Sequence, residues 1–195
     1  MQQSFLLGLG LDGVIHAGDA LQPVGPRGFL EFLELHAGTW SLPVPGIERI
    51  GAFLAILQDA DKTDLIPYYS RSFRADPVGT ARVLLGWLDS WELHGWDGHV
   101  PVGLPERLAQ LAGLTMGFPL PSEGGRLRRV ESAIRQGAVI PLDRLELFDD
   151  LDAWPEAWRR VLALLPHSVR ETRGMAPLGT DLGNLQRSQI GRAHV

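Results

Sequence analysis

The stretch Ser4-Phe5-Leu6-Leu7-Gly8-Leu9-Gly10-Leu11 decides the fold class, because a short apolar run is followed at once by turn-forming residues. Such a run predicts a buried first strand. A turn-rich segment continues to Gly25, and Pro26 then stands where the first residue of a helix is favoured. Phe29, Leu30 and Leu33 form an apolar face, and Gly38 is placed to end the helix. The chain therefore opens with a strand, a loop and a helix.

The middle of the chain has the period of helices rather than strands. Asp76 and Pro77 form a helix start, and Gly95 provides a stop. Ile47, Ile50, Leu54 and Leu57, and later Ala81, Leu84, Leu88 and Trp91, recur at helical spacing. Helices are predicted over residues 45–60, 77–94, 105–112 and 122–136.

A two-residue period returns at Arg144-Leu145-Glu146-Leu147-Phe148, which predicts a second strand. A turn, a helix over residues 155–165 and a further strand over 168–171 are expected after it. The order indicates an α/β domain over residues 1–172, with a parallel sheet and a helical insertion, at about residues 43–138, between the first and second strands. Residues 173–189 are expected to form a loop or the start of the next element.

Composition excludes several classes of protein. The chain of 195 residues has a net charge of −5, so it lacks the overall positive charge that drives nucleic-acid binding by counterion release, although local basic patches are compatible with this total. It contains no cysteine, which excludes disulfides, thiol catalysis and zinc-thiolate sites. No apolar run reaches the roughly 18 residues of a membrane span. The N-terminus also lacks the basic start of a signal peptide, so we expect a cytoplasmic protein without a membrane partner.

The last six residues, Ile190-Gly191-Arg192-Ala193-His194-Val195, match the conceptual translation of a common sequencing adapter. We therefore expect residues 190–195 to be an artificial tail, which has to be left out of fold reasoning. The natural reading frame would then continue beyond Gln189, and the chain would be an N-terminal fragment of a longer protein.

Two motifs near the first strand suggest phosphate chemistry, and each lacks an essential residue. The segment Leu9-Gly10-Leu11-Asp12-Gly13 resembles the start of a haloacid-dehalogenase-type phosphatase, but Gly10 occupies the position of the nucleophile. Asp12 alone would leave a degenerate enzyme. Further on, Gly25, Arg27 and Gly28 stand where a phosphate-binding loop would lie, yet the required lysine and hydroxyl are missing. Helix capping is the favoured interpretation, and no cofactor is expected to bind.

Two charged clusters each have two interpretations. Asp149, Asp150 and Asp152 follow a strand, where they could bind a metal ion, and precede a helix, where they could cap it. Capping is favoured, because no histidine or glutamate converges on them in the sequence. Arg126, Arg128 and Arg129 make one predicted helix locally basic, and they are either a DNA contact or a solvated face.

Several sequence segments together resemble the N-terminal part of a bacterial PD-(D/E)XK nuclease family protein of the AddB/RexB helicase-nuclease-subunit type. They lie at residues 24–34, 69–77, 81–89, 95–98, 104–108, 144–148, 158–160 and 179–186. The resemblance implies a partial P-loop-helicase-like domain that has lost its ATPase motifs, followed far downstream by a nuclease domain that requires Mg²⁺. It also implies DNA and an AddA-like helicase subunit as partners of the intact protein.

From this resemblance we expect a non-catalytic domain of a nuclease that processes DNA double-strand breaks, acting as a scaffold and as a contact for DNA or a partner. Two alternatives stay open. The first is a degenerate phosphatase that uses Asp12, and the second is a plain protein-interaction module.

Overall fold

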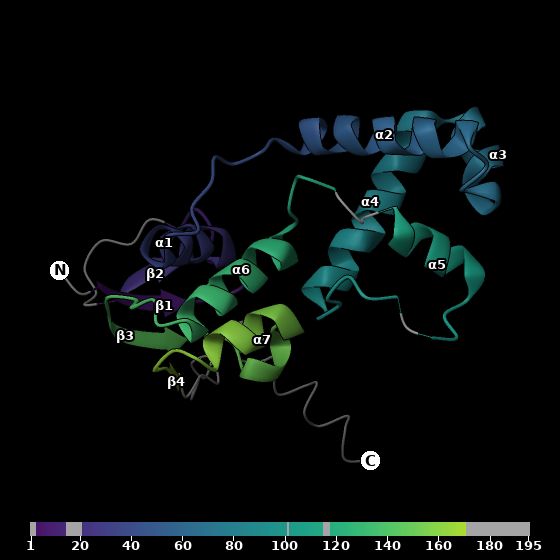
Figure 1. Ribbon diagram of the computed structural model, residues 1–195. Helices are drawn as coiled ribbons and strands as arrows, with labels where there is room; N and C mark the ends of the chain where they lie inside the picture. The colour runs from purple at the N-terminus through teal and green to yellow at the C-terminus, as the bar shows by residue number, and fades with distance from the viewer. Residues whose placement is uncertain (1–2, 15–20, 101, 115–117, 171–195) are drawn as a thin grey trace, which may run out of the picture.

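The computed structural model describes residues 3–14, 21–100, 102–114 and 118–170, which form a sheet layer and a helical lobe (Figure 1). Four strands form an all-parallel sheet in the order β2-β1-β3-β4. They are β1 (Gln3–Leu7), β2 (Gln22–Val24), β3 (Leu142–Leu147) and β4 (Ser168–Val169). The α/β class and the parallel sheet predicted from the sequence are confirmed. The expected linker at 173–189 and the tail at 190–195 lie outside the described residues.

Strand β2 was not predicted, and it changes the place of the insertion. Residues 22–24 are only three, include Pro23, and pair in parallel with residues 5–7 of β1. So short a strand has no apolar period of its own, and its partner is distant in sequence. The helical insertion therefore lies between the second and third strands, and the prediction that it follows the first strand was wrong. Strand β1 also ends at Leu7 rather than Leu11, because residues 9–10 already form a turn.

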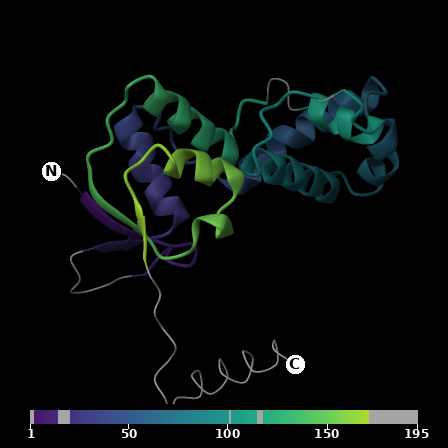
Figure 2. The ribbon, with the colours of Figure 1, turned by 90° about the horizontal axis from the view of Figure 1, so that it is seen from below.

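Helices α1 (Pro26–Ala37), α6 (Glu123–Arg135) and α7 (Glu156–Leu162) lie on one face of the sheet (Figure 2). Alternate residues of β1 and β3 point into this layer, as their burial patterns show. The shared core contains Phe5, Leu7, Phe29, Leu30, Leu33, Leu127, Val130, Leu145, Leu147, Trp154, Trp158 and Val161. Gly38 ends α1 with a φ of 69°, as its position in the sequence predicted.

The helical lobe consists of α2 (Gly46–Lys62), α3 (Pro67–Ala75), α4 (Pro77–Leu93) and α5 (Glu106–Gly113). Its separate core includes Phe53, Leu57, Ile66, Phe73, Leu84, Leu85, Leu88 and Leu111. Helix α3 was not predicted, because only Phe73 of its nine residues is buried and no apolar stripe marks it. Ile47, placed in the apolar stripe of α2, is 68% exposed. No helix in the described part of the chain is long and apolar enough to cross a membrane.

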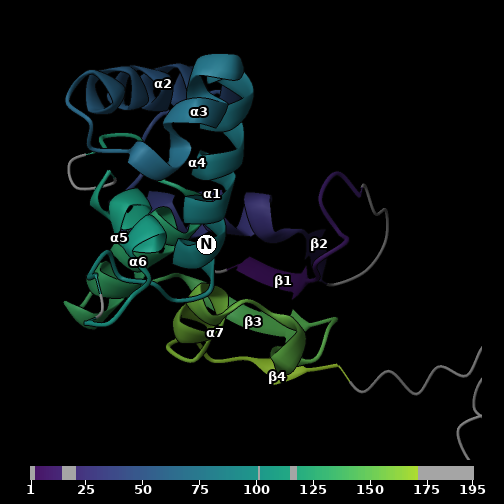
Figure 3. The ribbon, with the colours of Figure 1, turned by 90° about the vertical axis from the view of Figure 1, so that its right-hand side faces the viewer.

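The lobe is joined to the sheet layer through the C-terminal end of α4, which packs against α6 and α7 (Figure 3). Ser122 donates a hydrogen bond to Glu92 at this contact. Arg128 donates to the backbone carbonyls of Trp96 and Asp97, just beyond α4. Helix α6 falls within the predicted insertion, but its buried residues belong to the core of the sheet. Helices α2 to α5 thus form the lobe, and α6 is part of the sheet layer.

Candidate functional site

The strand order places a topological switch point at the carboxyl ends of β1 and β3. The chain leaves β1 towards β2 on one side and leaves β3 towards β4 on the other. In open parallel sheets, ligands bind at the point where the connections diverge in this way. Three segments singled out in the sequence meet at this edge: the turn that contains Asp12, the start of α1 at Gly25, and Asp149 after β3.

The Asp12 carboxylate lies at the N-terminus of α1. It accepts hydrogen bonds from the backbone amides of Arg27 and Gly28, at 3.4 and 3.5 Å. These amides belong to the first turn of α1, whose N-cap residue, Gly25, has no side chain to offer. A negative charge at a helix N-terminus is stabilising, because the orphan N–H groups and the helix dipole favour it. The chain therefore supplies its own anion at this position.

Residue 25 has to be glycine, because Asp12 lies very close to the backbone at this position. A Cβ atom at residue 25 would lie 2.2 Å from Asp12 Oδ1 and 2.3 Å from the Asp12 backbone nitrogen. We therefore expect Gly25→Ala to lower the free energy of unfolding by about 1–2 kcal/mol, because the turn must move and α1 loses its capping carboxylate. Urea unfolding followed by circular dichroism measures this. Gly10→Ala is the matched control, because a Cβ there meets nothing within 4 Å. Equal midpoints for the two variants would contradict the requirement.

Asp149 lies at the same edge of the sheet, and it does not cap the helix that follows. Its Oδ2 accepts a hydrogen bond of 2.7 Å from the backbone amide of Leu9. A 3₁₀ turn, Leu151–Ala153, separates Asp149 from α7, whose N-cap is Pro155 with no side-chain hydrogen bond. The capping favoured for this cluster was therefore wrong for α7. In the described residues, no group of three histidine, aspartate or glutamate side chains could hold a metal ion.

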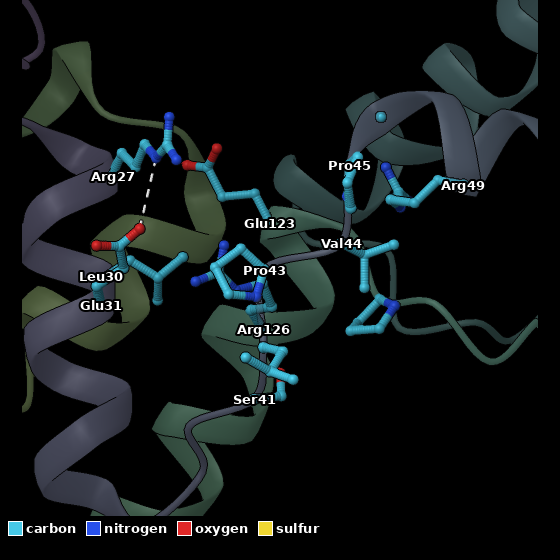
Figure 4. A pocket seen from close by; sticks show the side chains of 13 residues that line it. Arg27, Leu30, Glu31, Ser41, Pro43, Val44, Pro45, Arg49, Glu123 and Arg126 are labelled. Carbon is cyan, nitrogen blue, oxygen red and sulfur yellow. Dashed lines mark hydrogen bonds and ion pairs between the residues drawn. The ribbon is translucent and has the colours of Figure 1, made fainter.

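A cavity of about 560 Å³ lies beside the start of α1, between the sheet layer and the helical lobe (Figure 4). Arg27 contributes both to the Asp12 contact and to the cavity: its backbone amide donates to Asp12, and its side chain lines the cavity. The extended segment that joins α1 to α2 forms one wall, and the first turns of α2 and α6 form others. The lining residues are Arg27, Leu30, Glu31, Ser41, Leu42, Pro43, Val44, Pro45, Gly46, Arg49, Pro121, Glu123 and Arg126.

Two arginines that line the cavity are hydrogen-bonded to carboxylates that lie outside its lining. Arg126 donates to both oxygens of Glu34, through Nε at 2.9 Å and Nη2 at 2.6 Å. This hydrogen-bonded contact with Glu34 raises the pKa of Arg126, against the opposing effect of burial. Arg49 makes the corresponding two contacts with Asp89, at 2.6 and 2.7 Å. Neither carboxylate lines the cavity.

The three arginines predicted as a DNA contact have three different surroundings. Arg126 pairs with the buried Glu34, and Arg128 binds the backbone carbonyls after α4. Arg129 is exposed, and within the described residues it has no ion-pair partner. These three side chains do not form one continuous basic face, and contact with DNA through them stays a prediction.

Sequence reasoning missed the cavity and its two anchored arginines. One signal was present: Glu34 stands one residue after Leu33 and four after Leu30, within the apolar face of α1. A carboxylate at such a position is buried, and a buried charge requires a partner. Nothing in the sequence identifies Arg126, 92 residues away, as that partner.

Comparison with known proteins gave no relative on which to base a function: no family model matches the chain, and neither does any curated protein or solved structure.

Proposed function

We propose that this chain is a non-catalytic, P-loop-helicase-like domain of a nuclease that processes DNA ends, and that it acts as a scaffold and as a contact for DNA or a partner subunit. The observation that carries the proposal is the Asp12 carboxylate at the N-terminus of α1. It stands where a P-loop protein that hydrolyses nucleotides would hold phosphate.

Electrostatics and chemistry both support the proposed loss of nucleotide hydrolysis. A phosphate at this helix start would have to displace Asp12 or lie against its negative charge. The lysine that would bind the β- and γ-phosphates and the hydroxyl that would bind magnesium are also missing from residues 25–29. The other part of the proposal is a role in processing DNA ends. It is supported by the sequence segments that resemble helicase-nuclease subunits.

The two alternatives differ in their support. A phosphatase that uses Asp12 would need this carboxylate free to transfer a proton and a nucleophile two residues earlier, where Gly10 stands. Asp12 is instead hydrogen-bonded to α1. A protein-interaction module has one observation in its favour, since Trp40 and Leu42 of the segment that joins α1 to α2 are exposed apolar side chains.

Titrations with two labelled ligands test the proposal. With labelled ATP and Mg²⁺ we expect no saturable binding in the micromolar range, because the α1 N-terminus already holds a carboxylate. Micromolar binding that is abolished by Gly28→Val would show a working phosphate loop. With a fluorescent single-stranded oligonucleotide we expect saturable binding that weakens as salt is added. A chain that binds no DNA at any salt concentration would refute the DNA contact and leave the interaction module.

A further inference from the structure

We draw no further inference here: the strongest candidate, the exposed apolar surface of Trp40, Leu42, Pro43 and Pro45 on the extended segment that joins α1 to α2, carries none, because nothing in the part of the chain that the structure describes shows what covers it.

Discussion

Replacing Arg126 by leucine is expected to lower the free energy of unfolding by about 3–5 kcal/mol. The reason is Glu34, which is fully buried in the core of the sheet layer and receives both of its hydrogen bonds from this one guanidinium. Without Arg126 the carboxylate would be left as an unpaired charge in a place that water does not reach. Chemical unfolding of the parent and the variant, followed by tryptophan fluorescence, measures the difference.

Two further variants show whether the loss comes from the stranded charge. Arg129→Leu changes the same residue type three positions along the same helix, but that side chain is exposed, so its effect should stay within about 0.5 kcal/mol. The double variant Glu34→Leu/Arg126→Leu should recover most of the loss, because apolar residues often replace a buried ion pair with little penalty. If the double variant is no more stable than Arg126→Leu alone, loss of packing rather than the unpaired charge would be the cause.

The sequence predicted those elements whose signals are local. Gly25 and Pro26 mark the start of α1, and Asp76 caps α4 through the amide of Gly79. By contrast, β2 is held by bonds to β1, which come from a segment 15 or more residues away and leave no period in residues 22–24. A short strand of this kind is defined by its partner and not by its own residues.

The candidate site shows the same division between local and long-range information. The sequence identified Asp12, Gly25 and Asp149 separately, each by a short motif. Their convergence depends on parallel pairing of β1 with both β2 and β3, which brings three loops to one edge. The cavity was not predictable at all, because the side chains that define it belong to α1, α2, α6 and the segments that precede α2 and α6. Only the packing of the helical lobe against the sheet layer brings them together.

A substitution at Gly124 tests the packing of the helical lobe against the sheet layer. Helix α6 passes so close to the end of α4 that a Cβ atom at Gly124 would lie 2.4 Å from the backbone carbon of Glu92 and 2.6 Å from the nitrogen of Leu93. Backbone atoms cannot move aside as a flexible side chain can, so Gly124→Ala has to push the two helices apart. We expect it to lower the free energy of unfolding by about 2–3 kcal/mol.

The next residue supplies a control in the same helix turn. A Cβ at Gly125 would meet Pro121 Cβ at 3.4 Å, an ordinary contact, so Gly125→Ala should be neutral or stabilising by up to about 1 kcal/mol through helix propensity. Because both substitutions gain the same propensity, the difference between them isolates the contact between α4 and α6. Equal stability of the two variants would mean that the lobe and the sheet layer do not approach each other closely in solution, and the cavity between them would lose its structural basis.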